Sequence, residues 1–181
     1  IVRHAPANRE VVGTNIVWFK RDLRVRDHAP LRRAAERGLV LCLFVYEGDL
    51  WRQEEAHASH LLFINECLRE LDASLRERGA RLTLRRGRMP DVLATLDADL
   101  RGAHGVDAAI ESLFSHEETG SNITYERDKR LKRWCDEHNV EWTEIPQHGV
   151  IRRLSTRNGW AKKWDDRMSQ PVTHTPERIA W

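Results

Sequence analysis

Several kinds of segment are absent from this sequence. No apolar run approaches the roughly 18 residues that a membrane-spanning helix needs, so we expect no membrane association. No G-x-G-x-x-G or G-x-x-x-x-G-K motif follows the first apolar run, which argues against the usual dinucleotide and P-loop phosphate cradles. No basic segment followed by an apolar one opens the chain, so we expect no secretory signal and a cytoplasmic location.

Cysteine is scarce, and charge of either sign is nearly balanced. Cys42, Cys67 and Cys135 lie far apart in apolar surroundings, which is typical of buried free thiols rather than of a disulfide framework or a metal knuckle. The 30 Lys and Arg residues against 28 Asp and Glu give a net charge of +2. The basic clusters have acidic neighbours, so we interpret them as solvated helix faces rather than as a nucleic-acid footprint.

What the sequence does contain is a regular alternation of apolar runs and amphipathic segments. Strands are predicted at 16–19, 39–46, 81–85, 107–113 and 141–145, and helices at 30–37, 58–78, 90–101 and 123–138. This order predicts an α/β fold: a Rossmann/flavodoxin-like, doubly wound sheet of five parallel strands in three layers, α/β/α, with the strand order 3-2-1-4-5.

Three regions differ in composition. Residues 1–14 are interpreted as a disordered leader and 15–146 as the α/β domain. Residues 147–181 carry three tryptophans and two prolines but no clear strand pattern, with a short helix expected at 160–168. We interpret this last region as a linker, and we expect Ile179 and Trp181 to pack against a part that lies outside this sequence.

Polar residues follow three of the predicted strands, and the carboxyl ends of parallel strands converge in a doubly wound sheet. Carboxylates, an ammonium group and flanking aromatic rings could together hold a flat heteroaromatic ligand. The candidate binding residues are Lys20, Asp22, Leu23, Tyr46, Glu47, Glu111 and Glu118. For several of them a plain structural role is an open alternative, and Arg24 with Asp27 is interpreted mainly as a pair that shapes the turn.

The sequence gives little support for a metal site or for nucleophilic catalysis. The stretch from His116 to Glu118 lacks the second histidine of a zinc-protease motif, so no metal site is predicted. No nucleophilic Ser-His-Asp set is identifiable, and the seven tryptophans are interpreted as packing residues. We therefore expect no catalytic residues in this chain alone.

Four stretches resemble the photolyase/cryptochrome family. The opening WFKRDLRVRD matches the family pattern WFR-x-DLR-x-x-D, with Lys20 in place of the first arginine of the turn. Residues 58–96 resemble the family's second helix, third strand and third helix. Residues 115–128 are similar to the H-x-E-T stretch of the DASH branch, and 152–168 resemble the segment that leaves the α/β domain.

This resemblance implies an N-terminal antenna domain of a DNA photolyase or cryptochrome. The domain would hold a folate, deazaflavin, flavin or lumazine chromophore. The parent would carry FAD in a following helical domain and act on damaged DNA or sense blue light. One departure is that Ile123 and Thr124 stand where classical photolyases have an Asn-Glu pair for folate. The alternative from the residues themselves is a nucleotide-binding stress or signalling module.

Overall fold

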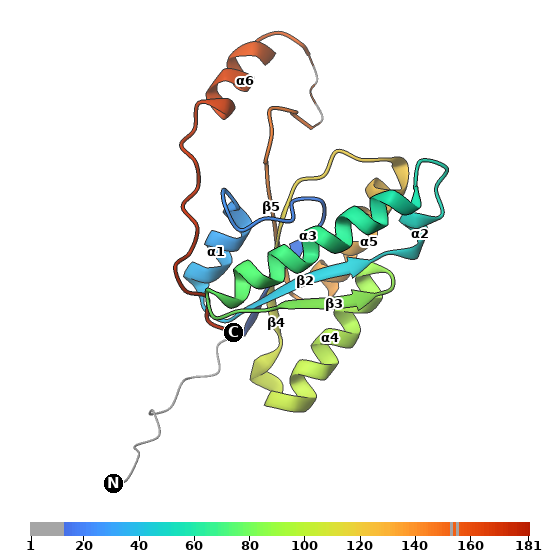
Figure 1. Ribbon diagram of the computed structural model, residues 1–181, viewed down its shortest axis with the longest axis vertical. Coiled ribbons are helices and arrows are strands. Elements are labelled where there is room, and N and C mark those ends of the chain that lie inside the picture. Colours follow the sequence, from blue (N-terminus) through green and yellow to red (C-terminus); the bar gives the residue numbers. More distant parts are fainter. Residues whose placement is uncertain (1–12, 153, 155) are drawn as a thin grey trace.

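The computed structural model describes residues 13–152, 154 and 156–181, which form a five-stranded parallel sheet between two layers of helices (Figure 1). The strand order is β3-β2-β1-β4-β5, with every neighbouring pair parallel. The predicted fold class and strand order are therefore confirmed. The strands are β1 (Thr14–Phe19), β2 (Val40–Tyr46), β3 (Leu82–Arg86), β4 (Ile110–His116) and β5 (Glu141–Ile145). The helices are α1 (Ala29–Arg37), α2 (Gly48–Trp51), α3 (Ala58–Arg76), α4 (Met89–His104), α5 (Asn122–Glu137) and α6 (Trp160–Met168).

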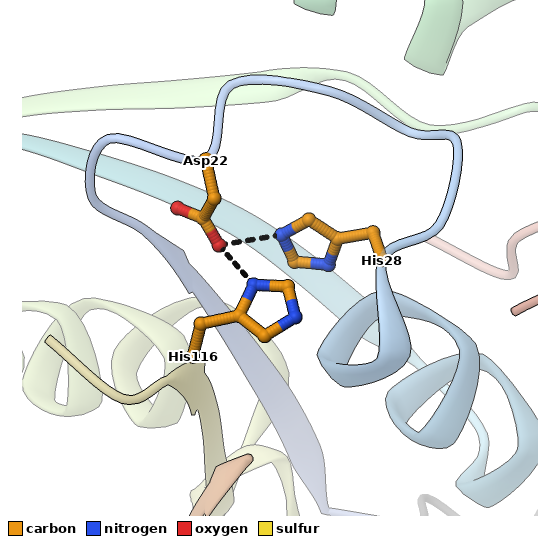
Figure 2. Close-up of side chains that lie close together, drawn as sticks. All are labelled: Asp22, His28 and His116. Atoms are coloured by element: carbon orange, nitrogen blue, oxygen red, sulfur yellow. Dashed lines mark hydrogen bonds and ion pairs between the residues drawn. The ribbon is translucent and has the colours of Figure 1, made fainter. Parts of the chain in front are cut away.

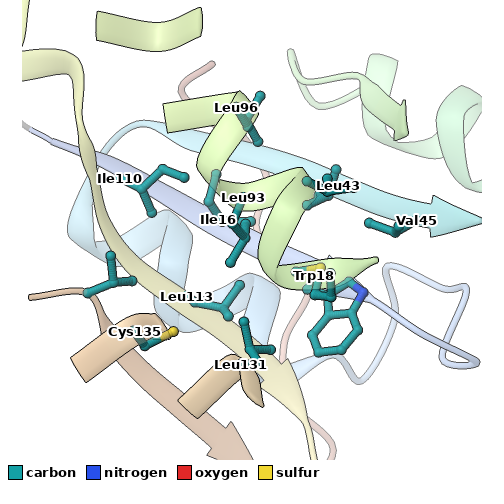
Figure 3. Packing of buried hydrophobic residues seen from close by; sticks show 13 residues of the cluster. Ile16, Trp18, Leu43, Val45, Leu93, Leu96, Ile110, Leu113, Leu131 and Cys135 are labelled. Carbon is teal, nitrogen blue, oxygen red and sulfur yellow. The ribbon is translucent and has the colours of Figure 1, made fainter. Parts of the chain in front are cut away.

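The central strand β1 is buried along its whole length because both faces of the sheet are covered. Ile16 and Trp18 point to one face, where α4 and α5 pack through residues such as Leu93 and Leu131 (Figure 3). The alternation of side chains along a strand places Val17 and Phe19 on the other face.

The second face of the sheet is covered by α1 and α3. Val17 and Phe19 contact a cluster that includes Leu31 of α1 and Leu71 of α3. Helix α3 ends at Arg76, and three residues later Gly79 adopts φ +88°, a conformation that favours glycine, in the turn that follows the helix.

The main difference from the predicted boundaries concerns β4. The segment 106–108 forms a single 3-10 turn, so β4 begins at Ile110 and continues to His116. The prediction of 107–113 was therefore wrong by three residues, which places His116 at the end of the strand rather than in a loop. The short helix α2 was not predicted.

The C-terminal tail, residues 171–181, packs onto the domain itself. Ile179 is buried in the cluster of the α1/α3 face, and its N–H donates to the carbonyl of Arg78 at 2.8 Å. The N–H of Val40 donates to the carbonyl of Ala180, also at 2.8 Å. The expectation that Ile179 needs an outside partner was therefore wrong.

Of the predicted leader 1–14, all but the last two positions lie outside the described residues, and Thr14 already belongs to β1.

Two expectations from composition can be compared with the described residues. Within them, none of the helices is both long enough and apolar enough to cross a membrane. Cys42 and Cys135 are buried free thiols as predicted, whereas the free Cys67 on α3 is only half-buried.

The fold predicts a large difference between two leucine substitutions. Leu113 of β4 has no exposed surface, so Leu113→Ala should lower the free energy of unfolding by about 2–5 kcal/mol through lost burial and a residual cavity. Leu62 of α3 is 65% exposed, and Leu62→Ala should change it by less than about 0.5 kcal/mol. Chemical denaturation followed by circular dichroism measures both; equal losses would contradict the assigned core.

Candidate functional site

The turn after β1 is fastened by a buried carboxylate, Asp22, shown in Figure 2. Its Oδ1 accepts the backbone N–H of Lys20 at 2.8 Å. Its Oδ2 lies 2.8 Å from Nε2 of His28, which precedes α1, and 2.6 Å from Nδ1 of His116, which ends β4. We call Asp22, His28 and His116 the Asp22 clasp. It joins the β1–α1 turn, the start of α1 and the end of β4.

The hydrogen bonds of the clasp fix the tautomer of His28. Nδ1 of His28 accepts the N–H of Leu31 at 3.1 Å and so caps the first turn of α1. The proton of the neutral ring is then on Nε2, which donates it to Asp22. Although the three side chains have the composition of a metal-ligand set, a metal on Nε2 would require a proton on Nδ1, facing the N–H of Leu31. We therefore assign the clasp to hydrogen bonding.

The ionisation of the clasp follows from its surroundings. Burial alone would raise the pKa of Asp22, but the hydrogen bonds from His116 and His28 outweigh it and lower that pKa. Burial lowers the pKa of His28 and outweighs the opposing effect of Asp22. The pair is therefore an ionised aspartate beside a neutral histidine.

A cleft of about 880 Å³ opens at the carboxyl ends of β1 and β2, beside the loop that follows β4. The strand order reverses between β1 and β4, and the segments that follow these two strands both line the cleft; ligands bind at such a point in open α/β sheets. Its walls are largely apolar and aromatic, and they come from β2, α2, α3 and the β1–α1 turn: Leu23, Phe44, Leu50, Trp51, Phe63 and Ile64. Such walls suit a planar apolar ring system.

One end of the cleft is polar, and its centre is the buried guanidinium of Arg127 on α5. Nη1 donates to Glu47 at 2.8 Å, Nη2 donates to Glu118 at 2.6 Å, and Nε donates to Asp128 at 2.9 Å. We call Lys20, Glu47, Glu118, Arg127 and Asp128 the polar base.

The pKa values of the polar base show the competition between burial and charge. Burial opposes the charge of Arg127, but Glu47, Asp128 and Glu118 together outweigh it and raise its pKa. Burial raises the pKa of Glu47 and of Asp128, against the attraction of their cationic neighbours. Of these groups, Glu47 and Glu118 line the cleft together with Lys20 and Arg127, whereas Asp128 does not line it, so two carboxylates and two cations bound this end.

Lys20 is the second cation of the polar base, and its side chain is only 6% exposed. Its Nζ donates to the carbonyl of His116 at 3.1 Å and lies 3.8 Å from Oε1 of Glu144. It also lies 4.4 Å from the ring centroid of Trp18, and the guanidinium of Arg127 lies 4.6 Å from the same centroid. Burial lowers the pKa of Lys20.

The structure brings most of the predicted binding residues together. Lys20, Leu23, Glu47 and Glu118 all line the cleft. Asp22 lies next to it and lines a smaller cavity of about 110 Å³ with His116. Its oxygens are engaged in the clasp, so the structure gives it a positioning role.

Two predicted residues lie elsewhere. Glu111 is the second residue of β4, at the amino end of the sheet, where its Oε1 is 3.6 Å from Nη2 of Arg37. Its placement at a carboxyl strand end was wrong because β4 begins three residues later than predicted. The hydroxyl of Tyr46 donates to Asn65 of α3 at 2.6 Å, so this ring packs between β2 and α3 rather than lining the cleft.

Sequence reasoning missed the role of Arg127 and of the histidines. Thr124, Arg127, Leu131 and Cys135 are the buried residues of α5, at helical spacing. A charged residue in this stripe was a usable signal. The sequence carried no comparable signal for His28, because histidine is not among the preferred residues at a helix N-cap.

The turn role predicted for Arg24 and Asp27 takes a different form from a pair of side chains. Arg24 donates to the backbone carbonyls of Arg26 and Asp27, both at 3.1 Å. The carboxylate of Asp27 instead accepts the N–H of Thr173 at 2.9 Å, which ties the tail to the turn.

Comparison with known proteins gives consistent matches. A family model described as DNA photolyase matches residues 15–164. A cryptochrome DASH from Oryza sativa subsp. japonica, described as chloroplastic/mitochondrial, is 28% identical over 154 residues, which cover 81% of this chain and 24% of that protein.

Solved structures show the same fold at low sequence identity. A class III photolyase from Agrobacterium tumefaciens has a TM-score of 0.71 and 20% identity, over 99% of this chain and 37% of that one. An archaeal photolyase from Sulfolobus tokodaii, solved with two FAD molecules, has a TM-score of 0.60 and 21% identity, over 92% of this chain and 37% of that one. The chain thus spans well under half the length of each of these proteins.

The clasp predicts a loss of stability in mild acid. Below pH 6.5 the unfolded chain protonates His28 and the folded chain does not, so the free energy of unfolding should fall by up to about 1.4 kcal/mol per pH unit. Asp22, whose pKa is lowered, adds a loss in the same direction below pH 3.8. Urea denaturation between pH 5 and 8 should show a shallower slope for His28→Asn than for the exposed control His104→Gln; an unchanged slope in His28→Asn would refute the assignment.

The polar base predicts that Arg127 stabilises the fold strongly. Arg127→Leu removes the guanidinium that pairs with all three carboxylates and should lower the free energy of unfolding by about 3–5 kcal/mol. Arg32 makes an exposed ion pair with Glu36, and Arg32→Leu should cost less than about 1 kcal/mol. Thermal and urea denaturation compare the two, and similar losses would contradict the buried network.

Proposed function

Because the chain belongs to the DNA photolyase family, as the N-terminal domain of its photolyases and cryptochromes, we propose that its cleft holds a light-harvesting chromophore. The candidates are a folate, a deazaflavin, a flavin or a lumazine. The observation that carries the proposal is the cleft of about 880 Å³, which is lined by the segments after β1 and β4, the two strands between which the strand order reverses.

The donor set fits such a group. Aromatic and aliphatic side chains form long walls for a planar ring, and Glu47, Glu118 and Lys20 supply polar contacts at one end. The bound group would supply light absorption, and the residues of the chain would fix its orientation and exclude water. The archaeal structural neighbour contains two FAD molecules, which favours a flavin among the candidates.

In an intact parent protein we expect two partners for this domain. One is a helical domain with a catalytic FAD, which would receive the excitation energy. The other is damaged DNA, on which reduced FAD would reverse a pyrimidine dimer in a photolyase, whereas a cryptochrome would signal in blue light. A cytoplasmic location stays a prediction of the sequence.

A nucleotide-binding signalling module is less well supported by the site. The first turn of α1, where a phosphate would bind, is closed by the side chain of His28. This closed turn does not favour ATP or AMP.

The proposal is tested by the absorption spectrum and mass spectrometry of ligands extracted from the purified chain, followed by titration with FMN, a deazaflavin, a lumazine and methenyltetrahydrofolate. We expect at least one of them to bind. Trp51→Ala, which removes an aromatic wall, should weaken binding about 2- to 10-fold.

Glu111→Ala is the matched control, because Glu111 lies at the opposite end of the sheet, and it should leave the affinity unchanged. Co-purified ATP, or binding of ATP with none of the four chromophores, would refute the antenna proposal.

A further inference from the structure

Glu47 and Glu118 of the polar base each use one carboxylate oxygen in a hydrogen bond to Arg127. One oxygen of Glu47, Oε2, accepts from Arg127 at 2.8 Å. Oε2 of Glu118 accepts from the same guanidinium at 2.6 Å, and its Oε1 lies 3.8 Å from Nε of Arg21, beyond hydrogen-bond distance. Each carboxylate therefore retains acceptor capacity.

The second oxygen of Glu47 faces the cleft. Among the described residues, every side-chain nitrogen or oxygen that is closed off from solvent has a hydrogen-bond partner. Within that part of the chain, Oε1 of Glu47 makes no hydrogen bond, so it keeps contact with open space. Glu47 is 7% exposed and lines the cleft, which is the space it reaches.

Two exposed guanidinium groups line the cleft where it opens to solvent. The side chain of Arg21 is 80% exposed, and its Nε lies 3.8 Å from Oε1 of Glu118. Arg24 and Glu55 are also exposed and line the cleft. An anionic group of a ligand that reaches the solvent edge can therefore meet Arg21 and Arg24.

We propose that the cleft binds a planar heterocycle by a ring N–H beside a carbonyl, with this N–H donating to Oε1 of Glu47 and any anionic tail directed to Arg21 and Arg24. The inference rests on the proposed function and specifies the chemistry and orientation of the ligand. Flavins, deazaflavins and lumazines carry this edge as an imide, and pterins carry it as a lactam.

In this arrangement Arg127 is a positioning residue. Its guanidinium holds Glu47 and Glu118 in place and lies over the ring of Trp18, so their free oxygens have a defined direction. A ligand N–H donor then meets a charged acceptor away from bulk water, where such a hydrogen bond is stronger than in solvent.

The experiment compares riboflavin with riboflavin methylated at the imide nitrogen, and pterin with its ring-N-methylated form, by fluorescence titration. Methylation removes the donor, so the matching methylated ligand should bind the wild-type chain about 10- to 100-fold more weakly. The flavin and pterin pairs distinguish the two sources of the edge. Because these comparisons use the wild-type chain, they do not depend on whether a variant folds.

Glu47→Leu should bind the methylated and unmethylated members of a pair equally well, while Arg127 keeps Glu118 and Asp128 as partners. Glu111→Leu is the matched control and should preserve the discrimination. A second arm compares FMN with riboflavin: the phosphate should improve affinity about 2- to 5-fold at low salt, and Arg21→Ala should remove this gain.

The two proposals fail in different ways. If the heterocycles bind and methylation changes nothing, or if Glu47→Leu keeps the discrimination, the orientation inferred here is overturned and the antenna function stands. If no chromophore binds, the antenna function fails and this inference fails with it.

Discussion

The interaction on which the site depends is the pair of hydrogen bonds that one oxygen of Asp22 accepts from His28 and His116. A carboxylate at 3% exposure is stable only where donors replace the water it has lost. The three donors to Asp22 come from the end of β1, the start of α1 and the end of β4. The turn that carries Lys20 and Leu23 into the cleft is thereby held against the sheet.

The second organising feature is the separation of apolar and charged surface within the cleft. Burying a guanidinium is costly, and three carboxylates offset that cost for Arg127. This concentrates ionic groups at one end and leaves the remaining walls to Trp51, Phe63 and their neighbours. The cleft is therefore polar at one end and apolar along its walls, so an elongated ligand with one polar end is favoured in one orientation.

Topology and part of the site were predictable because they follow from periodicity. Parallel strands converge at their carboxyl ends, so Lys20 and Glu47 were placed correctly from sequence alone. Glu111 was misplaced because a single 3-10 turn at 106–108 moved the start of β4, and strand boundaries depend on such local turns more than on apolar pattern. The contacts of Arg127 with Glu47 and of His116 with Asp22 could not be predicted, for a different reason. They join residues 80 and 94 positions apart through side-chain geometry, which no local pattern encodes.

The position of the tail in the sequence affects the order in which the two faces of the sheet can be completed. The face of the sheet that packs on α4 and α5 is built from residues up to 142, whereas the face that packs on α1 and α3 includes Ile179. During synthesis the chain emerges from the ribosome N-terminal end first. The α4/α5 layer can therefore consolidate early, and the α1/α3 layer is completed only when residues 179 and 180 arrive to bond with Arg78 and Val40. Until then the nascent domain exposes part of one core, on the face that packs against α1 and α3.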